Sequence, residues 1–187
     1  MKVGNSFGVN IIYNIKNIIY NHGMQNAPIP NDEDKRLEAV HRLAILDTNP
    51  EERFDVITRE AVEKLQVPIS MVTILDSKRE WFKSCTGLNE KEGERAVSFC
   101  GHALMAQNMF VIEDTFKDPR FADNPMVIGF PFIRFYAGFA LFDHKTHQPV
   151  GVFCVKDTKP RTLSIQEMGI IFDLADRAEK ELNKVLE

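Results

Sequence analysis

The sequence is poor in cysteine. It has three cysteines in 187 residues, Cys85, Cys100 and Cys154, and no two of them form a CxxC pair. Because the number of cysteines is odd and they are far apart in the sequence, a disulfide framework is not expected. This pattern is typical of a reducing compartment, so we expect a cytoplasmic protein. The absence of a CxxC pair also argues against a zinc site, and His144 and His147 have no third ligand nearby in the sequence. We therefore predict no metal and no cofactor.

The sequence also lacks an excess of basic residues and a long apolar run. Lysine and arginine total 23 against 27 acidic residues, a net charge of -4. Without an overall basic field we expect no binding to nucleic acid. The isoleucine-rich stretch in residues 1–23 is interrupted by asparagines and is too short and too polar to span a bilayer. The length fits one globular domain.

Residues 1–23 differ in composition from the charged sequence that follows. They are rich in Ile, Asn and Tyr, and the change falls just before Met24. We interpret them as a non-native start or a dispensable arm; the alternative is an additional dimerisation or membrane-surface helix. The predicted organisation is an N-terminal arm, disordered or non-native, over residues 1–30 and one domain over residues 31–187.

The remaining sequence alternates helical and strand patterns. The last helix opens at Ser164 with a capping box completed by Glu167. Helices are predicted at 32–46, 50–65, 98–107 and from 164 almost to the C-terminus, and strands at 67–75, 80–85, 110–112, 133–142 and 149–156. This order predicts an α+β fold, an antiparallel sheet with helices on one face and an irregular crossover on the other.

The candidate site lies in the segment from Ser98 to Pro125 and on the strand that follows it. Here polar groups of both signs and aromatic rings stand in irregular sequence, which is typical of a ligand pocket. The candidate ligand-binding residues are Phe99, Cys100, His102, Asp114, Asp118, Arg120, Phe121, Asn124, Arg134 and Tyr136. Alternatively, the segment is a self-bracing loop in which Arg120 or Arg134 pairs with Asp114 or Asp118.

Cys100 and His102 allow two interpretations. At the start of a predicted helix, the helix dipole and free backbone N–H groups can lower the pKa of a thiol, as in catalytic or redox cysteines. We favour the other interpretation, in which Cys100 packs as a small apolar residue and His102 is held by hydrogen bonds in the core or at the rim of a pocket.

Several segments together resemble a GAF domain of the type found in bacterial sensor histidine kinases and diguanylate cyclases. They are RLEAVHRLAILDTNPEERFDVITREAV, SMVTILDSKREWFKSCTGL, SFCGHAL, DPRFADNP and IRFYAGFAL followed by PVGVFCVKD. The resemblance implies a PAS-like sheet of five or six antiparallel strands, with a small-molecule pocket under the crossover. It also implies terminal helices that often pair in a dimer.

We therefore expect a ligand-binding sensory module rather than an enzyme. Its signal is expected to pass through the terminal helices to a homodimer or to a separate signalling protein. Two alternatives remain. One is a free methionine-R-sulfoxide reductase with Cys100 as nucleophile, although the cysteine-bearing loop of those enzymes would fall near Phe130–Gly138, where this chain has no cysteine. The other is a ligand-free dimerisation scaffold. The residues considered for a dimer face are Leu37, Val40, Ala44, Ala175, Leu182 and Val185.

Overall fold

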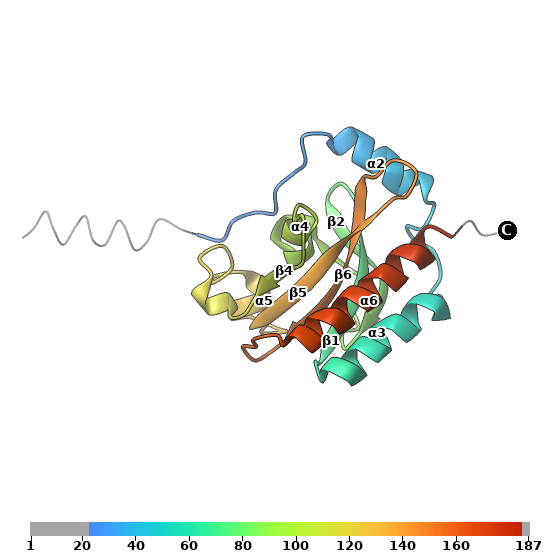
Figure 1. Cartoon of the computed structure of the whole chain (residues 1–187). Coiled ribbons are helices and arrows are strands. Elements are labelled where there is room, and N and C mark those ends of the chain that lie inside the picture. Colours follow the sequence, from blue (N-terminus) through green and yellow to red (C-terminus); the bar gives the residue numbers. More distant parts are fainter. Residues whose placement is uncertain (1–22, 185–187) are drawn as a thin grey trace, which may run out of the picture.

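The computed structural model describes residues 23–184, which form one antiparallel sheet covered on both faces (Figure 1). The strand order is β3-β2-β1-β6-β5-β4, and every neighbouring pair is antiparallel. The strands are β1 (Ile69–Leu75), β2 (Arg79–Thr86), β3 (Glu92–Glu94), β4 (Phe110–Ile112), β5 (Phe135–Phe142) and β6 (Pro149–Asp157). The predicted α+β fold with an antiparallel sheet of five to six strands is confirmed.

The helices divide between the two faces of the sheet. They are α2 (Glu33–Arg42), α3 (Glu52–Leu65), α4 (Phe99–Ala103), α5 (Pro125–Ile128) and α6 (Ile165–Leu182). Helices α3 and α6 lie side by side on one face, and α4, α5 and the crossover lie on the other (Figure 1). As predicted, α6 begins with a capping box in which Ser164 and Glu167 bond each other's backbone N–H groups.

Two predicted helices are shorter than the sequence indicated. The first ends at Arg42 because Ala44 adopts a left-handed backbone conformation, φ 50°, that a helix cannot continue through. The helix predicted to reach residue 107 ends as α4 at Ala103. Beyond it, Met105 and Ala106 bond to carbonyls three residues back, the tighter pattern that often closes a helix. The short elements β3 and α5 were not predicted.

Each face of the sheet has its own hydrophobic core. The core under α3 and α6 contains Phe54, Phe153 and Ile171, and the core under the crossover contains Met71 and Phe121. Alternate residues of the central strands supply the two cores in turn, as the period of two along a strand requires. The candidate site is therefore built on the crossover face of the sheet.

Three of the six residues considered for a dimer face contribute to the helix-side core instead. Val40, Ala175 and Leu182 are buried against the sheet. They cannot contact a second copy, because they already cover the domain's own sheet. Val185 lies outside the described residues, as do residues 1–22 of the expected N-terminal arm.

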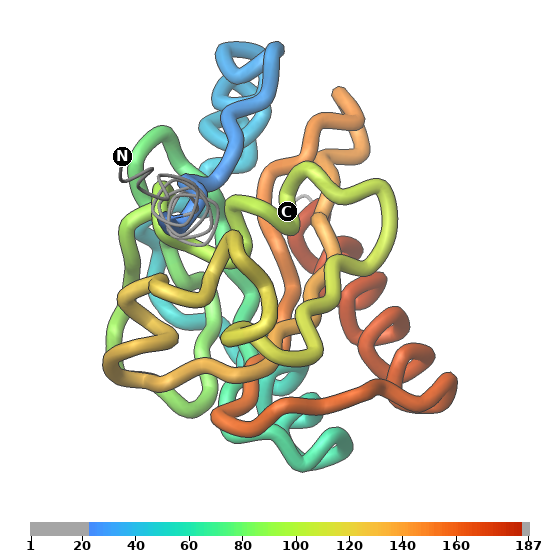
Figure 2. Tube along the Cα trace, turned by 90° about the vertical axis from the view of Figure 1, so that its left-hand side faces the viewer, coloured from blue at the N-terminus to red at the C-terminus, as the bar shows by residue number. Residues whose placement is uncertain are grey.

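Residues 23–30, which we call the N-terminal strap, run as extended chain over the crossover side before α2 begins (Figure 2). The backbone N–H of Gln25 donates to the carbonyl of Arg120 at 3.1 Å, and that of Ala27 donates to the carbonyl of Ala96 at 2.8 Å. Ala27 is buried, and a Cβ at Gly101 would lie 2.5 Å from its Cβ. Glycine at position 101 thus lets the strap close against α4.

A buried ion cluster fixes α2 to the sheet. The carboxylate of Glu33 accepts two hydrogen bonds of 2.8 Å from Arg36 and is also bonded by Arg95, while Arg36 donates to the carbonyl of Leu75 at 2.7 Å. Arg36 and Arg95 are fully buried. Burial opposes the charge of Glu33, but the two guanidinium groups prevail and lower its pKa to about 2. One carboxylate therefore serves two buried cations.

Replacing Glu33 by Gln should destabilise the domain. The substitution leaves two buried guanidinium groups without their anion, which should lower the free energy of unfolding by about 2 to 3 kcal/mol. Chemical denaturation of both proteins measures the difference. Glu38→Gln, an exposed position of the same helix, is the matched control and should be nearly neutral. Equal effects of the two substitutions would contradict this role of Glu33.

Candidate functional site in the crossover

Stacked aromatic rings fill the space between the sheet and the crossover. Phe99 of α4 stacks on Phe121 with ring centroids 4.7 Å apart and on Tyr136 of β5 at 5.3 Å, both with an interplanar angle of 17°. All three rings are fully buried. A Cβ at Gly138 would lie 2.6 Å from the Tyr136 hydroxyl, so glycine there makes room for it. The predicted contacts Phe99, Phe121 and Tyr136 thus form packed core.

Cys100 lies in the same core. It is fully buried, its Sγ lies 3.6 Å from the Sγ of Cys154, and the Tyr136 hydroxyl donates to it at 3.2 Å. Burial raises the pKa of the Cys100 thiol well above its ordinary value. A thiol in this environment stays protonated at neutral pH and is a poor nucleophile. The geometry therefore fits a packing role for Cys100.

His102 joins α4 to the strap. Its Nε2 lies 3.0 Å from the carbonyl oxygen of Gln25, and its ring meets Phe121 edge-on at 4.7 Å. Burial lowers the pKa of His102, and the charge of Arg120 lowers it further, while the hydrogen bond to Gln25 partly offsets both. The neutral ring, donating from Nε2, is the favoured form.

A groove of about 650 Å³ lies on the outer side of the crossover. Its two walls are the crossover after β4 and the loop that precedes α6, which are joined by a 3.0 Å hydrogen bond from the backbone N–H of Arg161 to the carbonyl of Glu113. The lining residues are Val111, Ile112, Glu113, Asp114, Lys117, Asp118, Pro119, Arg120, Pro160, Arg161 and Thr162. Three predicted site residues, Asp114, Asp118 and Arg120, thus come together in the groove.

The loop residues Pro160, Arg161 and Thr162 are a wall that sequence reasoning missed. The sequence signal for it is weak: a Lys-Pro-Arg stretch that ends two residues before the capping box of the last helix. Its place beside the crossover depends on the bond to Glu113, which joins residues far apart in the chain.

Two ion pairs brace the crossover. Arg120 makes a bidentate contact with Asp118, with hydrogen bonds of 2.9 and 2.6 Å, and Arg134 donates to Asp114 at 2.8 Å. The hydrogen bond from Arg120 lowers the pKa of Asp118, and that from Arg134 lowers the pKa of Asp114. Both pairings of the self-bracing alternative therefore exist, and they still leave the groove open beside them.

Asn124 and Arg134 lie apart from the groove. Asn124 is buried; its side-chain oxygen accepts from the N–H of Met126, and its Nδ2 donates to the carbonyl of Val97 at 2.8 Å. Arg134 just precedes β5 and stacks over the Phe116 ring at 4.3 Å. Both residues hold the crossover in shape.

Residues 23–184 contain no group of three or more His, Cys, Asp or Glu side chains placed to hold a metal ion. Within the same range, no helix combines the length and apolar character needed to cross a bilayer.

Comparison with known proteins identifies the family. The model of the GAF domain matches residues 49–182, and the chain belongs to this family. It is 39% identical over 138 residues to a cyclic di-GMP phosphodiesterase of Pseudomonas aeruginosa, an alignment that covers 74% of this chain and 23% of that protein. The chain thus spans about a quarter of the length of this relative.

Solved structures support the fold. The GAF domain of a phosphoenolpyruvate-protein phosphotransferase from Coxiella burnetii aligns with a TM-score of 0.59 at 12% identity, covering 81% of this chain and 95% of that one. A type II free methionine-R-sulfoxide reductase from Thermoplasma acidophilum aligns with a TM-score of 0.58 at 12% identity, covering 77% and 94%. At this identity the likeness concerns the fold alone.

Opening the aromatic stack should cost more than removing its hydroxyl group. Tyr136→Ala leaves a cavity and should lower the free energy of unfolding by about 3 to 5 kcal/mol. Tyr136→Phe loses only the hydrogen bond to Cys100 and should cost about 1 kcal/mol. Denaturant titration of both variants checks this. Similar, small losses would mean that the ring is not an essential part of the core.

Acidification should destabilise the domain through His102. Its folded-state pKa lies below the ordinary value of 6.5, so the unfolded chain takes up the proton more readily and stability falls as the pH drops below about 6.5. The melting temperature, measured from pH 7.5 to 5.5, should fall less in His102→Gln, which keeps a donor for Gln25. A His102→Gln profile identical to wild type would contradict the assignment.

Proposed function

We propose that this chain is a sensory or regulatory GAF module that binds a small polar or anionic ligand in the groove beside Asp114, Asp118 and Arg120. The observation that carries the proposal is this groove, whose floor and walls hold charged groups of both signs at the rim of an apolar core. The interior between sheet and crossover is occupied by Phe99, Phe121 and Tyr136, which moves the ligand to the outer side of the crossover.

Arg120 connects the groove to the aromatic core and to the N-terminal strap. Its guanidinium group pairs with Asp118 in the groove and lies over the Phe121 ring at 5.2 Å, and its carbonyl accepts from Gln25 of the strap. A ligand carboxylate or phosphate can take the place of Asp118 at Arg120, because guanidinium groups bind either anion in the same bidentate geometry. Such an exchange would alter the position of Arg120 and, with it, the hold on the strap.

We expect a change in the groove to be passed on through the same contacts. The strap continues directly into α2, so a displacement of Gln25 reaches a terminal helix. We expect the output to be received by a second copy or a separate signalling protein in the cytoplasm, without nucleic acid. The buried, protonated thiol of Cys100 disfavours the alternative of a methionine-sulfoxide reductase.

A thermal-shift screen tests ligand binding. The panel contains free amino acids, dicarboxylates, and linear and cyclic nucleotides. A ligand present at about a hundred times its Kd adds about 2.7 kcal/mol of stability, which should raise the melting temperature by roughly 5 to 10 °C.

Two charge reversals locate the site. Lys117 lines the groove with 83% of its side chain exposed, so Lys117→Glu should change the ligand-induced shift without altering the fold. Lys78→Glu, at an exposed position distant in sequence, is the matched control. A shift that both variants retain in full would place the ligand elsewhere, and no shift with any compound would favour the ligand-free scaffold.

A further inference from the structure

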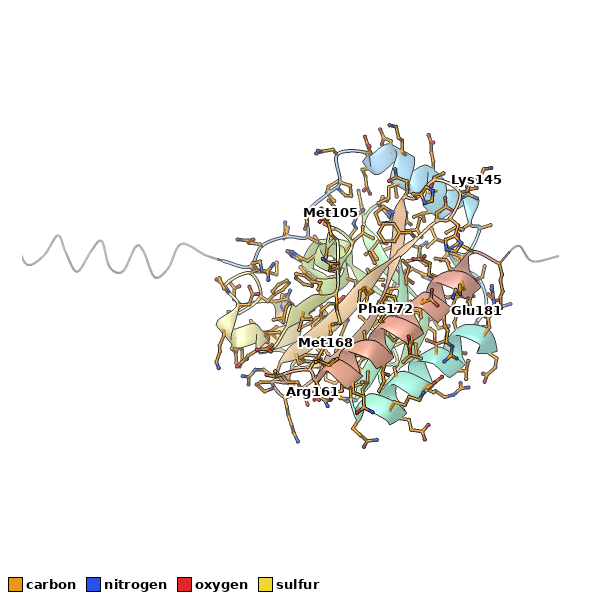
Figure 3. All side chains as sticks on the ribbon, in the orientation of Figure 1. Met105, Lys145, Arg161, Met168, Phe172 and Glu181 are labelled. Atoms are coloured by element: carbon orange, nitrogen blue, oxygen red, sulfur yellow. The ribbon has the colours of Figure 1, made fainter. Side chains whose placement is uncertain are left out.

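A second cleft, of about 680 Å³, lies between α3 and strand β2. It is lined by the loop between α2 and α3, by one side of α3, by β2 and by the loop that follows β2. Helix α3 contacts β1 and β2, whereas α6 contacts β5 and β6. Figure 3 shows Met168 and Phe172 on α6, which lies beside α3; the cleft is on the other side of α3, away from both residues. The cleft is therefore separate from the groove in the crossover, which lies on the opposite face of the sheet.

Lys83 holds one wall of the cleft in place. Its side chain is fully buried, and its ammonium group lies 2.5 Å from the Glu51 carboxylate. It also donates to the Thr48 hydroxyl at 2.7 Å and to the Asn49 carbonyl at 2.8 Å. These three acceptors use all three of its N–H groups. Lys83 therefore shapes the cleft but has no N–H group left for an anionic ligand.

The opposite wall carries a chain of hydrogen-bonded side chains that joins α3 to β2, which we call the hydroxyl row (Asp55, Ser84, Thr58 and Thr86). The Ser84 hydroxyl donates to the Asp55 carboxylate at 2.7 Å, and the Ser84 and Thr58 oxygens lie 2.9 Å apart. The Thr86 hydroxyl donates to that of Thr58 at 2.9 Å. Thr58 and Ser84 are buried, whereas the two ends of the row, Asp55 and Thr86, are partly exposed and line the cleft.

The protons of the hydroxyl row are all directed inward. A hydroxyl group has one proton, and a carboxylate only accepts. Because the Ser84 proton goes to Asp55, Thr58 must donate either to Ser84 or to the Asp55 carbonyl oxygen, 3.1 Å away. Thr86 in turn gives its proton to Thr58. The oxygen of Thr86 and the second carboxylate oxygen of Asp55 thus offer only lone pairs to a molecule in the cleft, so both ends of the row select hydrogen-bond donors.

The other charged side chains of the cleft are balanced. Three of them are held in ion pairs inside the domain, which are Asp47 with Arg79, Lys83 with Glu51 and Arg59 with Glu52. The remaining two, Glu90 and Lys91, carry opposite charges. Within residues 23–184 Asp55 forms no ion pair. A protonated amine supplies what this wall lacks, since it brings both N–H donors and a positive charge.

We propose that this cleft binds a small aliphatic amine, with an ammonium group on Asp55 and a second donor on Thr86. Ser84 and Thr86 lie on the same face of β2 two residues apart, a separation of about 7 Å, and Asp55 is bonded to Ser84. A short diamine or amino alcohol has donors at both ends and can reach both acceptors. The site is independent of the ligand proposed for the groove in the crossover.

Binding of the diamine putrescine, measured by isothermal titration calorimetry at low ionic strength, tests the site. Asp55→Asn keeps an acceptor for Ser84 but removes the charge, so it should raise the Kd roughly tenfold or more. Thr86→Val removes the second acceptor and should raise the Kd by about three- to tenfold. Thr86→Ser keeps the hydroxyl oxygen and should bind like the wild type. Asp173→Asn, at an exposed position of α6, is the control for loss of a negative charge and should also leave the Kd unchanged.

Two further titrations establish the place and the chemistry of binding. An amine bound in the groove beside Asp114 and Asp118 would bind more tightly to Lys117→Glu, whereas an amine in the cleft should bind this variant and the wild type equally. The diol with the same carbon chain carries no charge and should bind roughly tenfold more weakly than putrescine. The proposal is overturned if the wild type does not bind putrescine, if Asp55→Asn and Thr86→Val both keep the wild-type Kd, if Lys117→Glu binds more tightly, or if the diol binds equally well.

Discussion

The chemistry of the crossover depends on the packing of Phe99, Phe121 and Tyr136. These rings fill the interior on the crossover side of the sheet and are fully buried there. The same packing keeps the Cys100 thiol dry and protonated, because it surrounds the sulfur with rings and a second thiol. Charged side chains of the crossover then have only its outer surface on which to gather. The packing of these three rings therefore accounts both for the filled interior and for the position of the groove on the outer side of the crossover.

The N-terminal strap depends on that packing as well. The peptide groups at Gln25 are held from both sides, since the N–H donates to the carbonyl of Arg120 and the carbonyl oxygen lies 3.0 Å from Nε2 of His102. Both partners contact the Phe121 ring, Arg120 over its face and His102 at its edge. A shift of the Phe121 ring would therefore weaken both hydrogen bonds of the Gln25 backbone, the one to Arg120 and the one to His102. Beyond the strap, Glu33 and its two arginines hold α2 against the sheet.

The sequence was sufficient where the deciding contacts are local. The capping box at Ser164 and Glu167 places the start of α6 because its partners are three residues apart, and apolar runs bounded by turn residues place the central strands. It was insufficient where distant segments meet. Arg36 looks like an exposed helix residue until Glu33 and Arg95 are brought together. Tyr136 was expected to donate its hydroxyl hydrogen to a ligand from the floor of a pocket, yet that hydroxyl bonds Cys100 in the core. The pairings of Arg120 and Arg134, in contrast, were among the alternatives, because acidic partners are plentiful in the same segment.

The groove and the start of α6 are joined by the short loop before the helix. Arg161 bonds Glu113 with its backbone N–H in the groove, and its side chain lies 3.4 Å from Glu167 in the capping box that starts α6. A displacement of this loop would therefore act on the groove and on the start of α6 together. Because coupling free energies are reciprocal, a change at the start of α6 that alters the affinity of the groove for a ligand must itself be favoured or opposed by that ligand, by the same factor.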